Sequence, residues 1–170
     1  MSEQWRVGIG YDAHRFAGAR RLVLGGVEIP GEPGLEGHSD ADVLAHAVTD
    51  AVLGAAALGD IGRHFPDDDG AFRGADSIEL LARAVAIAHE AGWRVGNVDA
   101  TVICERPRLA PLLAGIEERL AGALELEVEG VNVKATTNEG MGFIGRSEGI
   151  ATVAVALLAH RGEADGRAGG

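Results

Sequence analysis

The stretch that decides the fold is GLEGHSDADVLAHAVTD, residues 34–50. It passes from a glycine-containing loop into apolar residues at helical spacing, so we expect a helix from about residue 40 to residue 58. Ser39 and Asp42, three residues apart, form the pattern of a capping box, which satisfies free backbone N–H groups at a helix start. Gly59 is the residue expected to end this helix.

Three polar residues recur at every fourth position along this stretch: Asp42, His46 and Asp50. Residues four apart lie on one face of a helix. A polar line of this kind needs water, a partner or a metal ion beside it. Asp42 can also serve only as the acid of the capping box, and Asp50 can simply be solvated.

A second polar pair lies in the segment GYDAH, residues 10–14. In an extended chain the side chains of Asp12 and His14 point to the same side. With His46 they make a set of two histidines and one carboxylate. Three protein ligands with one open position is the pattern of a catalytic zinc site. Spacing alone leaves open a packing role for His46, which is the commoner role of a lone histidine on a helix, and a surface role for His14.

Composition restricts the function classes. The chain has 170 residues and a formal net charge of −11, which argues against nucleic-acid binding and against attraction to anionic membranes. No apolar run approaches the ~20 residues needed to span a bilayer. Cys104 is the single cysteine, so no intrachain disulfide forms and a reducing cytoplasm fits best.

The remaining elements follow from periodicity and from glycine and proline. Further elements are expected as strands at residues 5–12, 93–104 and 131–137, a small hairpin at 22–29, and helices at about 76–91 and 107–124. Residues 60–74 form a polar loop that we interpret as a lid or binding segment. The pattern of residues 149–160 fits helix or strand. This order predicts an α+β (α/β sandwich) fold in one domain, residues 1–160, with a flexible tail at 161–170.

Six blocks stand out in order along residues 5–160: GYDAH, LGGVEIP, GHSDADVLAHA, LGDIGRHFPD, GNVDAT and KATTNEGMGFIGRSEG. Together they resemble the family of 2-C-methyl-D-erythritol 2,4-cyclodiphosphate synthases. The resemblance implies a lyase of the non-mevalonate isoprenoid pathway. In its reaction, the 2-phosphate of a cytidine-diphospho-methylerythritol phosphate attacks the β-phosphorus of its own diphosphate, and CMP leaves.

The resemblance also assigns roles to residues. It makes Asp12, His14 and His46 the zinc ligands and gives Glu139 a second divalent ion, Mg²⁺ or Mn²⁺, that bridges the diphosphate. Two positions match transition-state stabilisers, His38 and Thr137. The implied substrate-binding residues are Asp12, His14, His38, Ser39, Asp60, Ile61, Gly62, Phe65, Pro66, Asp67, Asp68, Asp69, Cys104, Glu105, Arg106, Pro107, Arg108, Leu109, Ala110, Thr136, Thr137, Asn138, Glu139, Phe143 and Arg146.

The architecture implied by the resemblance is a mixed four-stranded sheet with helices on one face, residues 149–160 being a strand. Three copies form a homotrimer with the sheets around the threefold axis, and each active site lies between two subunits. Phe143 and Arg146 would line an axial cavity that holds an isoprenoid diphosphate. The alternatives are core packing for Phe143 and an ion pair with Glu148 for Arg146.

Several expectations concern neighbouring residues and competing functions. Asp42 or Asp50 is a candidate to orient a ligand histidine through its second ring nitrogen. Since few residues precede the strand at residue 5, we expect a monofunctional synthase without a fused cytidylyltransferase domain. Two other functions stay open: a zinc-dependent phosphohydrolase, and a non-catalytic trimeric module that binds isoprenoid diphosphates or nucleotides.

Overall fold

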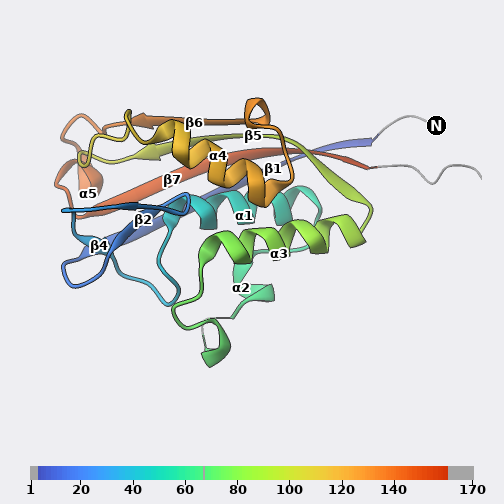
Figure 1. Cartoon of the computed structure of the whole chain (residues 1–170), viewed down its shortest axis with the longest axis horizontal. Helices are drawn as coiled ribbons and strands as arrows, with labels where there is room; N and C mark the ends of the chain where they lie inside the picture. The colour runs from blue at the N-terminus through green and yellow to red at the C-terminus, as the bar shows by residue number, and fades with distance from the viewer. Residues whose placement is uncertain (1–3, 67, 161–170) are drawn as a thin grey trace, which may run out of the picture.

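A computed structural model of the protein describes residues 4–66 and 68–160. Its centre is a five-stranded mixed sheet in the order β4-β1-β7-β5-β6 (Figure 1). The five strands are β1 (Gln4–Ala17), β4 (Gly34–Leu35), β5 (Trp93–Ile103), β6 (Val131–Thr136) and β7 (Gly149–His160). Strands β5 and β6 run parallel, and the other neighbouring pairs run antiparallel.

Helices cover one face of this sheet (Figure 1). The three long helices are α1 (Val43–Ala55), α3 (Ser77–Glu90) and α4 (Leu113–Leu124). Shorter elements are the hairpin strands β2 (Leu22–Leu24) and β3 (Val27–Ile29), α2 (Ile61–His64), η1 (Gly70–Phe72), η2 (Val128–Gly130) and α5 (Gly142–Gly145). The α+β class is therefore confirmed. Among the described residues, no helix has the length and apolar character that crossing a membrane requires.

The sheet differs from the expected four strands by one short strand. Strand β4 pairs with the end of β1, where Phe16 faces Leu35 and Ala17 faces Gly34. A two-residue strand leaves no alternation to detect in the sequence. Strand β7 lies between β1 and β5 and is mostly buried, which explains its nearly continuous apolar pattern. The expected tail, residues 161–170, lies outside the described residues.

Both ends of α1 differ from the expected capping box and terminal glycine. The N-cap is Asp42, whose side chain accepts hydrogen bonds from the backbone N–H groups of Leu44 and Ala45. Ser39 therefore does not cap the helix, and that prediction was wrong. The helix ends at Ala55, and the chain enters the left-handed region at Ala57 (φ 59°), before Gly59 is reached. Helix α4 likewise begins only at Leu113, later than expected.

Strand β1 and helix α1 lie in very close contact. A Cβ atom added at Gly8 would lie 2.0 Å from the carbonyl oxygen of Ala51, and one at Gly10 would lie 1.8 Å from that of Ala47. These glycines face the helix, and small alanines face them. Because side chains alternate along a strand, the next residues on this face of β1 are Asp12 and His14. The contact therefore brings both residues to the first half of α1.

The Gly10→Ala substitution is expected to lower the free energy of unfolding by about 1–3 kcal/mol or more, since the backbone of α1 must move to admit the methyl group. Gly18→Ala is the matched control, because a Cβ at Gly18 meets nothing within 4 Å. Denaturant unfolding of both variants measures the difference. Equal stability of the two would show that β1 and α1 are not in contact through these glycines.

Candidate metal centre and cavity

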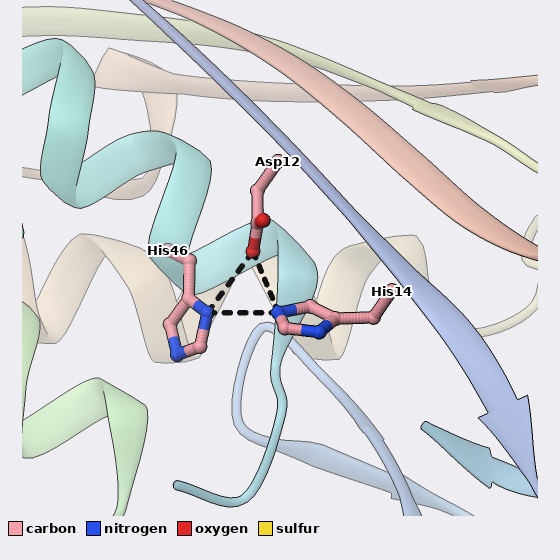
Figure 2. A group of neighbouring side chains, drawn as sticks. All are labelled: Asp12, His14 and His46. Atoms are coloured by element: carbon pink, nitrogen blue, oxygen red, sulfur yellow. Dashed lines mark hydrogen bonds and ion pairs between the residues drawn. The ribbon is translucent and has the colours of Figure 1, made fainter. Parts of the chain in front are cut away.

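Asp12, His14 and His46, the metal triad, point toward one another from β1 and α1 (Figure 2). The Oδ2 atom of Asp12 lies 2.9 Å from Nε2 of His14 and 3.0 Å from Nδ1 of His46. The two histidine nitrogens are 3.3 Å apart. Asp12 and His14, two residues apart on an extended strand, thus share a face, as the sequence predicted.

The donor set fits a tetrahedral ion. Bonds of about 2.0 Å at tetrahedral angles place ligand atoms about 3.3 Å apart, close to the three separations above. Each side chain of the triad is partly accessible, with relative exposures of 25% for Asp12, 19% for His14 and 14% for His46. Three ligands that meet at a partly open position can bind a metal and leave room for an exchangeable ligand.

The charge of Asp12 and the hydrogen bond of His14 both favour the binding of a cation at the triad. Burial by itself raises the pKa of Asp12, but hydrogen bonds and charges from His14 and His46 outweigh it and hold the pKa well below the usual range. The carboxylate is therefore ionised at neutral pH. Nδ1 of His14 lies 2.6 Å from the carbonyl oxygen of Glu36. Since a carbonyl can only accept, His14 donates to it from Nδ1, and when a cation takes the place of the proton between His14 and Asp12, Nε2 can supply its lone pair to that cation.

The triad opens into a cavity of about 210 Å³. Eight of the residues expected at the metal and the substrate line it together: Asp12, His14, His38, Ser39, His46, Ile61, Gly62 and Phe65. Four more lining residues were not assigned to the substrate from the sequence: Gly37, Asp50, Phe72 and Leu80. Phe72 lies within the loop at residues 60–74 that we interpreted as a lid or binding segment, whereas Leu80 lies in an expected helix, where an apolar residue is typical of core packing.

Within the expected lid, residues 60–74, the described residues include two short helical elements, α2 and η1. Asp50 accepts a hydrogen bond from the backbone N–H of Ile61 (2.8 Å), which ties α2 to α1 beside the cavity. Asp60 caps α2 through the N–H of Arg63. The rings of Phe65 and Phe72 pack edge to face at 5.5 Å. The predicted residues Pro66, Asp68 and Asp69 follow without lining the cavity, and Asp67 lies outside the described residues.

A second group of predicted residues gathers elsewhere, at the ends of β5 and β6. The backbone N–H of Cys104 donates to the carbonyl of Thr136 (3.0 Å), and Oε1 of Glu105 accepts from the N–H of Asn138 (2.8 Å). The hydroxyl of Thr137 donates to Oε1 of Glu139 (3.4 Å). We call residues 104–110 and 136–139 the β5–β6 loops. They do not line the cavity of the same chain.

Phe143 and Arg146 lie apart from both the cavity lining and the β5–β6 loops. Phe143 is 45% exposed, so the core-packing alternative does not describe it. Nε of Arg146 donates to Oε1 of Glu148 at 2.7 Å, which is the alternative considered for that side chain. Phe143, Glu148 and His14 line a further hollow. Phe143 therefore shares a hollow with His14, one of the three residues of the metal triad.

Neither acid proposed to orient a ligand histidine does so. The buried carboxylate of Asp42 accepts hydrogen bonds from the backbone N–H groups of Gly25 (2.9 Å) and Gly26 (2.7 Å) in the β2–β3 turn, as well as capping α1. Asp50 accepts from Ile61. The second ring nitrogen of His46, Nε2, instead contacts the hydroxyl groups of Ser39 and Ser77. Ser77 was not among the site residues predicted from the sequence.

A mixed sheet with helices on one face and an open metal triad above a cavity defines an α+β protein with a candidate catalytic metal centre. A family model described as the YgbB family matches residues 5–159. The chain belongs to this family. The resemblance inferred from the six sequence blocks is thereby confirmed.

Known proteins support this assignment at high coverage. A curated 2-C-methyl-D-erythritol 2,4-cyclodiphosphate synthase of Geotalea daltonii is 56% identical over 93% of this chain and 92% of its own length. The solved bifunctional IspDF of Campylobacter jejuni matches with a TM-score of 0.91 and 44% identity, over 94% of this chain and 43% of that protein. A Plasmodium falciparum IspF in complex with CDP matches with a TM-score of 0.81 and 30% identity, over 95% of this chain and 100% of that protein.

Asp42 joins the start of α1 to the β2–β3 turn, so its replacement is expected to lower the stability of the fold. Asp42→Ala removes a helix cap and leaves the N–H groups of Gly25, which is buried, and Gly26, which is partly buried, without their acceptor, which predicts a loss of about 2–5 kcal/mol in the free energy of unfolding. Asp76→Ala, which removes the cap of α3, is the control and should cost about 1 kcal/mol. Denaturant titration compares them; similar losses would mean that Asp42 acts only as a cap.

Proposed function

We propose that the protein converts 4-diphosphocytidyl-2-C-methyl-D-erythritol 2-phosphate to 2-C-methyl-D-erythritol 2,4-cyclodiphosphate and CMP, a step of isoprenoid biosynthesis. The observation that carries the proposal is a metal triad open to a cavity in a chain 56% identical to a curated synthase over 93% of its length. The attacking oxygen belongs to the substrate, so the protein needs to orient the substrate and stabilise charge.

The proposed metal at the triad is Zn²⁺, because two imidazoles and one carboxylate with an open position are the ligand set of catalytic zinc. Asp12, His14 and His46 would hold it. Zinc bound there supplies a Lewis acid for a phosphate oxygen. Histidines bind metals only when neutral, so the affinity for zinc should fall in acid.

Cavity residues would bind the phosphates and the sugar. His38 is exposed at the mouth of the cavity, and Ser39 lies behind it, so both can donate to phosphate oxygens. Asp60 caps α2 next to the cavity residues Ile61 and Gly62, and it can accept from the hydroxyls of the methylerythritol. No protein nucleophile is required. Consistent with this, burial raises the pKa of the Cys104 thiol to about 11, which keeps the sulfur protonated at neutral pH.

The β5–β6 loops would bind the rest of the substrate. Residues 104–110 would hold cytosine, mainly through backbone groups. Thr137 would stabilise the transition state, and Glu139 would hold the second cation, Mg²⁺ or Mn²⁺, at the diphosphate. The CDP complex of the P. falciparum protein supports a cytidine nucleotide as the ligand. Because these loops do not line the cavity of their own chain, we infer that a neighbouring copy supplies them.

The second face of β1 supports assembly. Its side chains Trp5, Val7, Ile9 and Tyr11 are between 52% and 70% exposed. Since Gly8 and Gly10 face α1, the alternation of side chains along β1 puts this β1 apolar row on the other face of the sheet, away from the long helices (Figure 1). Exposed apolar rows of this kind mark protein interfaces. We propose a homotrimer with these sheet faces around the threefold axis, and with Phe143 and Arg146 near an axial site for an isoprenoid diphosphate.

Removing a triad histidine is expected to abolish zinc binding and turnover while the fold is retained, since both rings lie at the edge of the cavity rather than in the core. His14→Ala and His46→Ala test this by metal analysis, circular dichroism and activity. His89→Ala is the control, because His89 lies near the end of α3, where its Nδ1 is 3.5 Å from Oε2 of Glu125 at the end of α4, away from the triad. An active His46→Ala protein without zinc would contradict the metal assignment.

The reaction itself is tested by ³¹P NMR of the protein with its proposed substrate and Mg²⁺, with and without a chelator. We expect CMP and the two coupled phosphorus signals of a cyclic diphosphate, abolished by chelation. A linear phosphate product would indicate the phosphohydrolase instead. Binding of CDP without turnover by the zinc-loaded protein would indicate the non-catalytic module.

A further inference from the structure

The far nitrogen of His46 enters a small buried network. Nε2 lies 2.9 Å from Oγ of Ser77 and 3.0 Å from Oγ of Ser39. Ser77, the first residue of α3, is completely buried. Its hydroxyl is also in contact with Oδ1 of Asp40. A line of polar groups therefore runs from Asp40 through Ser77 to His46, behind the metal triad.

The donors and acceptors of this line fix its direction. A carboxylate only accepts, so the hydroxyl of Ser77 must donate its single proton to Asp40. Toward His46, the same oxygen can then only accept, which requires the proton of the imidazole to be on Nε2. The ring in this tautomer keeps the lone pair of Nδ1 available for a metal ion bound together with Asp12 and His14.

We propose that Ser77 and Asp40 are positioning residues that fix the tautomer and orientation of His46 for metal binding. The proposal rests on the metal centre proposed above. Ligand histidines whose second ring nitrogen donates to a fixed acceptor have both a set tautomer and a more basic ligand atom. Here the fixed acceptor is a hydroxyl oriented by a carboxylate.

Asp40 is held firmly enough to orient Ser77. Its Oδ2 accepts from the backbone N–H of Ser77 and its Oδ1 from that of Asp42, both at 3.1 Å. The backbone N–H of Asp40 donates to the carbonyl of Ala75 at 3.1 Å. The carboxylate also lies at the N-terminus of α3, where the helix dipole favours negative charge. The position of α3 therefore determines, through Asp40 and Ser77, the orientation of the ligand His46 on α1.

Ser39 differs from Ser77 although both hydroxyls reach His46. Its oxygen accepts from the N–H of Ala41 (3.2 Å) and lies 3.3 Å from Oγ of Ser77. Among the described contacts it meets no carboxylate, so its proton is not committed to a fixed acceptor. Ser39 also lines the cavity, where its hydroxyl can donate to a phosphate. The two serines therefore divide two tasks, positioning and substrate binding.

The first test is the affinity for zinc, measured by competition with a chromophoric chelator at neutral pH. Ser77→Ala is expected to weaken zinc binding by about 10- to 100-fold, and Asp40→Asn in the same direction. Thr49→Val is the matched control, because it removes a buried hydroxyl from the same helix as His46 that donates only to the helix carbonyl of Ala45. Unfolding in the presence of chelator checks that each variant folds.

A double-mutant cycle tests whether Asp40 acts on His46 through Ser77 or whether the two substitutions weaken zinc binding independently. If Asp40 acts through Ser77, Asp40→Asn should lower the zinc affinity of the wild-type protein but scarcely change that of Ser77→Ala. ¹⁵N-edited NMR of the zinc-loaded protein adds a direct signature. The Nε2 proton of His46 should give a slowly exchanging signal that exchanges faster in Ser77→Ala and is unchanged in Thr49→Val.

The outcomes distinguish this inference from the proposed metal centre. Zinc binding by the wild-type protein that is lost in His46→Ala supports the centre, and an unchanged affinity in Ser77→Ala would then overturn the positioning role alone. Strictly additive losses in the cycle would also overturn it. Absence of zinc binding by the wild-type protein would overturn both proposals.

Discussion

The structure depends on the contact between the backbone of β1 and helix α1. Gly8 and Gly10 leave no side chain between them, and the alanines of the helix allow the axes to approach. This closeness does more than fill the core, since it fixes which residues of the strand meet which residues of the helix. The alternation that points two glycines at the helix also points Asp12 and His14 at it, and His46 lies on α1 where that face of β1 reaches it.

The same alternation gives β1 a second use. The face turned away from α1 carries the β1 apolar row, which is exposed in the single chain. Strand β1 thus contributes metal ligands on one face and an exposed apolar surface on the other. Within the proposed trimer, any shift of β1 would change the metal triad and the subunit contact together, which couples assembly to the geometry of the site.

Much of the triad could be predicted from the sequence, because the two-residue spacing of Asp12 and His14 fixes a shared face whatever the rest of the fold. The hairpin at Gly25 and Gly26 and helix α3 were likewise predicted, since local turn and capping chemistry decides them. Ser77 was not, because in the sequence it is only a residue at the start of the helix expected at about 76–91. Its contact with His46 is created by the packing of α3 on α1, which no local pattern encodes.

The capping prediction at Ser39 failed for an instructive reason. Ser39, Asp40 and Asp42 are all good N-cap residues, and a local pattern cannot choose among them. Tertiary contacts choose: Asp42 reaches the β2–β3 turn, Asp40 reaches the start of α3, and Ser39 faces the cavity. The two acids accept backbone N–H groups rather than bind metal, so part of the negative charge of this chain serves to join three elements around His46. The preorganisation of the triad is then a property of this loop as much as of the ligands themselves.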